Sequence, residues 1–434
     1  MGLRFFRVDR QNVQMVVGEV VSSRKPLDFY VDYVRGIVDD VRVRGDKALM
    51  EYVNRFDSPR ITLDDLRIPG TSLAKAYSKL DQRTKNALKR SAENISKVCR
   101  TQLKRLSFAK TVDQGVKVFQ RVAPLPAVGC YVPGGLARYP STALMTVLPA
   151  KVAGVSRVVV CTPPREDGVV DDVVLAALYM AGVDEVYAMG GPHAVAAMAY
   201  GTETVRPVFK IVGPGGPYVT AAKKLVSVDV PVDMLAGPTE LLVFGDEVRD
   251  AEDIALDMCA QAEHSADTLV GLITTSDELA NEVLKYLKLI AARLERGKTV
   301  EESLESNGFV ALCDGLKTVV DFIQELAPEH LFLASKAERI APHATNAGLI
   351  SSGRYTSPAL CDYVVGVNHV LPTGGQARVR GGLGVLDFVK LVVEVRVLKG
   401  AARRMGRHAA VLAWAEGLTA HAAAAGRLLN ENPR

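Results

Sequence analysis

The chain has 434 residues, of which 48% are hydrophobic and 24% are charged, and its formal net charge is +4. This composition is typical of a globular protein with two or three domains and excludes an intrinsically disordered chain. No apolar stretch reaches the roughly 18 residues needed to span a bilayer, and the first residues, MGLRFFRVDRQ, lack a signal-peptide core. We therefore expect a cytoplasmic protein.

Neither the basic residues nor the cysteines indicate a specialised class of protein. Basic residues cluster only near the end, at Lys399, Arg403, Arg404 and Arg407. Base-stacking aromatics are not interleaved with them, so a solvated helix face is favoured over a nucleic-acid patch. The six cysteines are widely spaced without a CxxC pair, which is typical of buried small hydrophobic residues. A nucleophilic Cys130 is a further alternative, although no His or Asn partner can be identified for it.

The first part of the chain is predicted to be helical. Amphipathic runs such as FYVDYVRGIVDDVRVRGDKALMEYVNRF fill residues 1 to about 110, and two β-like stretches follow in VKVFQRVAPLPAVGCYV. From Gly129 onward, apolar strands alternate with Gly or Pro turns and helices, through GCYVPGG, RVVVCTPP, EVYAMGG and FKIVGPGG. Because parallel strands need crossover helices, this alternation predicts a parallel sheet covered on both faces.

A second α/β segment begins near Thr268, with strands in TLVGLITT, NGFVALC, HLFLA and GLISSG. After Gly384 the pattern becomes helical again and ends in the Ala-rich run HAAAAGRLL. This tail is short for an independent core, so we expect it to pack on this chain or on a second copy. The predicted fold class is α/β, with two Rossmann-like parallel-sheet lobes and helical N-terminal and C-terminal extensions.

Glycines and prolines stand at the predicted carboxyl ends of the strands of the first lobe. Ligands bind at such ends in open parallel sheets, and glycines let backbone amides approach a phosphate. No GxGxxG pattern follows any of these strands. A nucleotide site of another kind and simple tight turns are both open interpretations of Gly134-Gly135, Pro163-Pro164, Gly190-Gly191 and Gly213-Pro214-Gly215-Gly216.

Polar residues that could form a metal and acid/base site are scattered along the chain. Gln261 and His264 lie three residues apart in the predicted helix DAEDIALDMCAQAEH, on a polar stripe with Asp257. This spacing can deliver two ligands to one ion, but Gln is an uncommon zinc ligand. The alternative is a solvated or core-edge His beside an unrelated Gln.

Further polar candidates follow in the second half of the chain. Glu329 and His330 are adjacent and have the chemistry for proton transfer. Asp362 lies in the turn-rich segment LCDYVVGVNHVLPTGG, from which a carboxylate could project as a ligand. Glu416 and His421 are separated by Gly417, so the sequence does not place them on one helix face.

Eight blocks in this order and spacing resemble histidinol dehydrogenase: GCYVPGG, YPSTALMTVLPAKVAGV, KIVGPG, VDMLAGPTE, QAEH, APEHL, DYVVGVNHVLPTGG and EGLTAH. The resemblance runs from about residue 30 to residue 425. It implies an NAD-dependent, zinc-requiring enzyme that oxidises L-histidinol to L-histidine through L-histidinal, the last step of histidine biosynthesis. It also implies a homodimer in which the C-terminal tail of one subunit completes the active site of the other.

The same resemblance implies roles for single residues. One Zn²⁺ per subunit would be held by Gln261, His264, Asp362 and His421, and it would orient the substrate. His330 would take the alcohol proton, and Glu329 would activate water on the aldehyde. The implied substrate contacts are Thr239, Gln261, His264, His330, Asp362, Glu416 and His421, of which Glu416 suits the ammonium group.

The chain differs from the usual residues of the family pattern at three positions, one in the implied substrate site and two in the implied NAD site. Thr239 stands where Ser is usual, which keeps the hydroxyl group. At the implied NAD site Tyr131 is retained, but His193 replaces the usual Gln of GGAQA and Gly216 replaces the usual Asn of GPGN. Backbone amides could replace those side-chain contacts, so we expect NAD, while the preference between NAD and NADP stays open.

The expected domains are an N-terminal extension (1–27), a discontinuous α/β domain with the metal and acid/base residues (28–130 with 240–383), a nucleotide-binding-like α/β domain (131–239) and a helical tail (384–434). Two other functions remain open. One is a related zinc alcohol dehydrogenase that acts on a sulfonated diol. The other is a catalytically silent homologue that binds metal and ligand, which the changes at His193 and Gly216 motivate.

Overall fold

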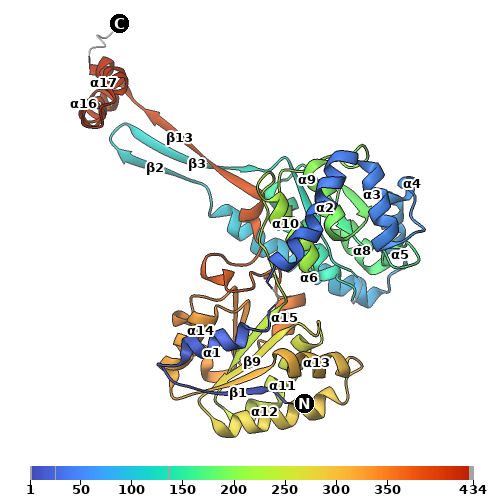
Figure 1. Cartoon of the computed structure of the whole chain (residues 1–434). Coiled ribbons are helices and arrows are strands. Elements are labelled where there is room, and N and C mark those ends of the chain that lie inside the picture. Colours follow the sequence, from blue (N-terminus) through green and yellow to red (C-terminus); the bar gives the residue numbers. More distant parts are fainter. Residues whose placement is uncertain (1, 25, 135–136, 430–434) are drawn as a thin grey trace. The chain divides into compact units, whose positions relative to one another are not determined.

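A computed structural model describes residues 2–24, 26–134 and 137–429 (Figure 1). The predicted turn glycine Gly135 lies outside the described residues. Contacts divide the chain into two units. The larger is Met1–Cys99 with Leu125–Phe388, and the smaller is Arg100–Pro124 with Val389–Arg434.

The larger unit contains a six-stranded parallel sheet. Successive residues of a strand point to opposite faces, so Leu241 and Val243 enter one core while Leu242 and Phe244 enter the other. One core is completed by α1 (Val13–Val21), α14 (Leu316–Leu326) and the 3₁₀ segment η3 (Ser335–His343), and the other by α11 (Ala251–Ala262), α12 (Asp277–Ala291) and α13 (Gly297–Asn307) (Figure 1). The strands, in sheet order, are β1 (Arg4–Val8), β10 (Phe309–Cys313), β9 (Leu269–Thr274), β8 (Glu240–Phe244), β11 (His330–Leu333) and β12 (Leu349–Ser352).

The larger unit also contains a four-stranded parallel sheet, in the order β6 (Glu185–Ala188), β5 (Arg157–Thr162), β4 (Ala127–Tyr131) and β7 (Ile211–Val212). Its helices are short and Ala-rich, and the strands are buried almost throughout, as expected for parallel strands covered on both faces. The crossover helices are α7 (Pro140–Ala153), α8 (Asp172–Ala181), α9 (Gly191–Tyr200) and α10 (Pro217–Val226).

The N-terminal helices pack on this four-stranded half. Helix α2 contacts α9 and α10, and α5 contacts α8. The predicted domains group residues 28–130 with the six-stranded sheet, whereas these three helix pairs join the N-terminal helices to helices of the four-stranded half. The segment 1–27 also forms part of the fold, because β1 pairs with β10 and α1 contacts α14. The helices are α2 (Asp28–Arg44), α3 (Asp46–Tyr52), the π-helical η1 (Val53–Asp57), α4 (Leu63–Leu66), α5 (Gly70–Lys79) and α6 (Gln82–Lys104).

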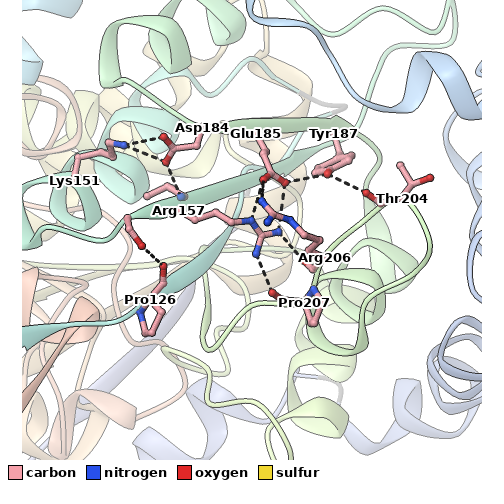
Figure 2. A network of polar contacts seen from close by, with 11 residues as sticks. Pro126, Lys151, Arg157, Asp184, Glu185, Tyr187, Thr204, Arg206 and Pro207 are labelled. Carbon is pink, nitrogen blue, oxygen red and sulfur yellow. Dashed lines mark hydrogen bonds and ion pairs between the residues drawn. The ribbon is translucent and has the colours of Figure 1, made fainter.

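A charged cluster closes the amino ends of β5 and β6 (Figure 2). Glu185 accepts hydrogen bonds from Arg157 (2.9 Å), Arg206 (2.8 Å) and the Tyr187 hydroxyl (3.0 Å). Burial by itself would raise the pKa of Glu185, but the Arg157 and Arg206 hydrogen bonds lower it to about 2. These partners lie at the edge opposite the glycine turns of this sheet, and together they satisfy the hydrogen-bonding groups of the buried Glu185 carboxylate.

The smaller unit is an antiparallel sheet, in the order β13 (Val389–Val397), β3 (Val116–Pro124) and β2 (Phe108–Asp113), followed by α16 (Lys399–Ala415), α17 (Thr419–Gly426) and the 3₁₀ turn η6 (Arg427–Leu429). The prediction of a wholly helical tail after Gly384 is therefore wrong for β13. Its sequence, VKLVVEVRV, is rich in β-branched residues and pairs with β3 along all nine positions. The helical prediction also missed β1 and β2.

Two predictions from composition agree with the structure. All six cysteines are buried and free. Within the described ranges, no helix combines the length and the apolar character needed to cross a membrane. The remaining short elements of the larger unit are α15 (Pro358–Tyr363) and the 3₁₀ turns η2 (Val248–Asp250), η4 (Gln376–Arg378) and η5 (Val385–Phe388).

Gly213 lies in a turn at the carboxyl edge of the four-stranded sheet, where the backbone leaves no room for a side chain. Its φ is +112°, and a Cβ at this position would lie 2.1 Å from the backbone oxygen of Tyr131. We expect Gly213→Ala to destabilise the protein by about 2 to 5 kcal/mol, from left-handed strain and overpacking. Thermal denaturation should show a clearly lower Tm. Gly216→Ala is the matched control, because a Cβ there meets nothing within 4 Å; equal Tm values for both variants would contradict the described turn.

Candidate active site

The predicted metal and acid/base residues of the larger unit gather at the amino edge of the six-stranded sheet. Thr239 directly precedes β8, and α11 then runs back along the strand, so that its end returns to the same edge before β9 begins. Gln261 lies in the last turn of α11 and His264 just beyond it. Nε2 of Gln261 donates to Oγ1 of Thr239 over 2.8 Å.

A hydrogen-bonded row continues from Thr239 to the start of β11. The Thr239 hydroxyl donates to Oε2 of Glu329 over 2.8 Å. The next residue is His330, and its Nε2 is 2.8 Å from the hydroxyl oxygen of Ser351. Glu329 and His330 are both buried. Burial raises the pKa of Glu329 well above its usual range, and it lowers the pKa of His330 to about 4. At neutral pH His330 is therefore an uncharged imidazole that can accept a proton.

Asp362 lies near the end of α15, which is fixed to α11. The Ser357 hydroxyl at the start of α15 donates to Asp257 of α11 over 2.6 Å. The Asp362 carbonyl oxygen is 3.0 Å from Nδ1 of His369. Burial raises the pKa of Asp362 to about 7, and the nearby Asp257 adds to this rise. Asp362 is therefore a carboxyl group whose charge is costly unless a cation stands beside it.

The donor set of the larger unit fits a divalent metal ion. It offers an amide oxygen, an imidazole and a carboxylate, from Gln261, His264 and Asp362. Burial lowers the pKa of His264, and Arg296 adds to this effect, which favours the neutral imidazole that a metal needs. In residues 2–24, 26–134 and 137–429, no group of three or more His, Cys, Asp or Glu side chains could hold a metal ion. The predicted set has only two such residues in this unit, because its third donor is an amide.

The other predicted residues, Glu416 and His421, belong to the smaller unit. Glu416 directly follows α16 and His421 lies in α17. Both side chains are exposed. Gly417, between them, has a positive φ of 74° and separates the two helices.

The predicted cofactor residues lie at the carboxyl edge of the four-stranded sheet. The Tyr131 hydroxyl accepts the Gly191 backbone N–H over 3.0 Å. His193 is fully buried, and its Nε2 lies 2.8 Å from Asp57, which also accepts the Gly190 N–H over 3.0 Å. The His193 imidazole thus holds the turn and does not face solvent.

Gly216 leaves open space at the carboxyl edge of the four-stranded sheet. It is exposed, it precedes the ten-residue helix α10, and a Cβ built there would meet no atom within 4 Å. A helix N-terminus without a side chain in front of it leaves room for a phosphate group at its backbone N–H groups. The donor set of this edge therefore fits a dinucleotide whose contacts are made mainly by backbone.

Three further polar residues, not predicted from the sequence, contact the predicted site residues. Oε2 of Glu240 accepts a hydrogen bond from the Glu329 backbone N–H. His369 contacts both Asp362 and Thr142: its Nδ1 faces the Asp362 backbone oxygen, and its Nε2 is 2.9 Å from the Thr142 hydroxyl. Asp57 anchors His193. Glu240 and His369 lie inside quoted blocks, VDMLAGPTE and DYVVGVNHVLPTGG, so attention to every polar residue of a block would have found them. Asp57 lies in a helical run without such a signal.

Known proteins of one family are similar to this chain over most of its length. The family model described as histidinol dehydrogenase matches residues 22–428. The chain belongs to the histidinol dehydrogenase family. The histidinol dehydrogenase of Methanothermobacter thermautotrophicus is 43% identical over 417 residues, which cover 96% of this chain and 97% of the relative. That of Rhizobium meliloti is 44% identical over 398 residues, covering 92% and 91%.

A solved structure of the histidinol dehydrogenase family has the same fold. The crystal structure of histidinol dehydrogenase from Elizabethkingia anophelis superposes with a TM-score of 0.92 at 30% identity, and 98% of each chain is covered. The predicted family and the predicted α/β fold class with two parallel sheets are therefore confirmed.

Proposed function

We propose that this protein oxidises L-histidinol to L-histidine through L-histidinal, with NAD and one zinc ion per subunit, as the last step of histidine biosynthesis. The observation that carries the proposal is the row Gln261, Thr239 and Glu329, hydrogen-bonded in sequence and continued by His330. This row connects a predicted metal ligand to a buried carboxyl group through two hydrogen bonds, and the buried imidazole of His330 belongs to the next residue of the chain. A metal-oriented alcohol oxidation followed by aldehyde oxidation needs these parts.

The proposed metal ligands are Gln261, His264 and Asp362 of one subunit, with His421 from the tail of a second copy. When bound, zinc would hold the substrate's imidazole and amino nitrogens, and NAD would accept hydride from the substrate carbon. Thr239 and Glu416 complete the proposed substrate contacts, and the Glu416 carboxylate suits the ammonium group.

Two side chains move the protons. In the first oxidation, neutral His330 takes the hydroxyl proton as the carbon loses hydride, which yields the aldehyde. In the second, Glu329 takes a proton from water while the water oxygen bonds to the aldehyde carbon. The resulting hydrate anion loses the second hydride to NAD and then one further proton, which gives the carboxylate. The raised pKa of Glu329, caused by burial, makes its ionised form a stronger base than an exposed carboxylate.

The proposed NAD site is the carboxyl edge that carries Tyr131, His193 and Gly216. Its support is the exposed N-terminus of α10 at Gly216 and the backbone turn at Gly190-Gly191, held by His193 through Asp57. His193 would contribute by holding this turn in place. Nothing in these contacts separates NAD from NADP, so the assay below includes both.

A second copy of this chain is the proposed partner. The smaller unit leaves large apolar side chains exposed, among them Val393 (60%), Val411 (68%) and Trp414 (64%). Monomeric proteins rarely leave so many such residues uncovered on one small unit. We propose that these residues pack in a homodimer and that the tail of one subunit supplies Glu416 and His421 to the other.

The proposal is tested by assaying purified protein with L-histidinol and with either dinucleotide. We expect two reduced dinucleotides per histidine formed, loss of activity with a chelator, and recovery with zinc. Turnover that stops at the aldehyde, or activity that survives metal removal, would count against the proposal. Preferential oxidation of a sulfonated diol would favour the related alcohol dehydrogenases, and binding of histidinol without any reduction would favour a silent homologue.

A further inference from the structure

A second buried carboxylate, Glu240, stands beside Glu329 at the amino ends of β8 and β11. Glu240 is 2% exposed and Glu329 is 7% exposed. The Glu240 backbone N–H donates to Oε2 of Glu329 over 2.6 Å, and the Glu329 backbone N–H donates to Oε2 of Glu240 over 3.3 Å. Because β8 and β11 are parallel neighbours, each residue fixes the side chain of the other through the sheet backbone.

The two carboxyl groups have unequal partners. Oε1 of Glu240 accepts hydrogen bonds from Nη2 of Arg24 (2.6 Å) and from the Gly374 backbone N–H (2.8 Å). Burial raises the pKa of Glu240, and the Arg24 guanidinium opposes that rise. Burial raises the pKa of Glu329 further, and the neighbouring Glu240 adds to that rise. Arg24 therefore stabilises the charge on Glu240, and Glu329 is the carboxyl group whose pKa is raised without a cation beside it to oppose the rise.

Arg24 comes from the N-terminal segment, for which no functional role was predicted. It follows α1 in a turn in which its N–H donates to the Val21 carbonyl oxygen over 3.2 Å. Ser23 binds Asn307 over 2.8 Å and anchors the same turn. The Arg24 side chain is 27% exposed and its partner Glu240 only 3%. A charge-assisted hydrogen bond this well covered is stronger than an exposed ion pair.

We infer that Arg24 and Glu240 are positioning residues for Glu329, which keep its carboxyl group where it can take a proton from water. The inference rests on the proposed role of Glu329 in the second oxidation. Arg24 and Glu240 act through the backbone N–H groups of Glu240 and Glu329 and need not touch the substrate. Removal of the guanidinium would leave the two buried carboxyl groups to repel each other or to share a proton, and either change displaces Glu329.

The experiment compares the two oxidations in Arg24→Ala, Arg24→Lys and Glu240→Gln. Oxidation of supplied L-histidinal measures the second step, and single-turnover formation of the first reduced dinucleotide from L-histidinol measures the first. We expect Arg24→Ala and Glu240→Gln to lower kcat for histidinal oxidation by about tenfold to a hundredfold, with the first step and the zinc content nearly unchanged. Arg24→Lys, which keeps a cation, should recover most of the rate.

Arg10→Ala is the matched control, because it removes an exposed ion pair with Asp321 from the same N-terminal segment. It should leave both oxidations unchanged. Equal loss of both oxidations, loss of zinc, or full activity in Glu240→Gln would overturn the positioning role. If Arg24→Ala does not fold, Arg24→Lys and Glu240→Gln decide the matter by the same comparison. Wild-type protein that cannot oxidise histidinal would instead contradict the proposed function itself.

Discussion

Replacing His264 with alanine is expected to remove zinc and dehydrogenase activity together. His264 lies two residues beyond the end of α11 and three residues after Gln261, and its burial favours the neutral imidazole that binds a metal ion. Loss of a partner that only orients a metal ligand costs about 10-fold to 100-fold in metal affinity, so loss of a ligand itself should cost more than about 100-fold. Zinc content and kcat/KM for L-histidinol are the measurements.

His343→Ala is the matched control for this prediction. His343 is an exposed histidine of η3 in the same larger unit, so its loss should change neither zinc content nor kcat/KM. A His264→Ala protein that keeps its zinc and its activity would show that the donor set described here is not the metal site.

The same variant also tests the proposed sharing of the site between subunits. His264→Ala and His421→Ala homodimers should both be inactive. If the tail of one subunit serves the other, a mixed dimer contains one site without either substitution and one site with both. Mixing and refolding the two proteins should therefore restore activity, up to about half of the wild-type activity in each mixed dimer. No recovery in verified mixed dimers would place both residues in the same subunit's site.

Replacing Glu329 with glutamine is expected to separate the two oxidations. Glutamine keeps the size of the side chain and can still accept the hydrogen bonds from Thr239 and from the Glu240 backbone, but it cannot take a proton from water. Zinc binding and the first oxidation should persist, while histidinal oxidation falls by about 100-fold to 10,000-fold, the usual contribution of a general base. The measurements are zinc content, first-step rate and histidine yield.

The pH dependence of the second oxidation gives an independent check on Glu329. Burial and the nearby Glu240 raise the pKa of this carboxyl group, so it keeps its proton to higher pH than an exposed glutamate does. Only the ionised form can act as a base. The rate of histidinal oxidation should therefore increase as the pH rises through this raised pKa. In Glu329→Gln this increase with pH should be absent.

Glu338→Gln is the control for charge removal, because Glu338 is exposed in η3. It should keep both rates and the pH profile. Loss of zinc in Glu329→Gln would show that Glu329 is a ligand instead of a base.

Long alternating patterns allowed most of the fold to be predicted. The strand, turn and helix alternation from Gly129 and from Thr268 identified two parallel sheets, because buried parallel strands are almost continuously apolar. Shorter or less regular segments were misassigned. Strand β13 lies between helices and is stabilised by pairing with β3, and β1 is stabilised by pairing with β10, so neither depends on local pattern alone.

The sequence does not predict at which edge of which sheet the candidate site lies. The general rule for open parallel sheets points to carboxyl ends, and the predicted cofactor residues do lie there. Thr239, Glu329 and His330 instead lie at the amino edge of the other sheet, where α11 returns Gln261 to β8. The pattern around Gln261 and His264 by itself favours an unrelated pair, and only the eight ordered blocks together indicate a metal site.

The sequence by itself determined the family, the two parallel sheets and the chemical types of the site residues, because these depend on periodicity and on which side chains are present. Only the tertiary structure decided which of these polar side chains contact one another. Arg24 and Glu240 are 216 residues apart in the chain, and Glu329 is a further 89 residues away. Their contact arises from the order of strands in the sheet, which brings distant segments to one edge, and no local pattern encodes that order.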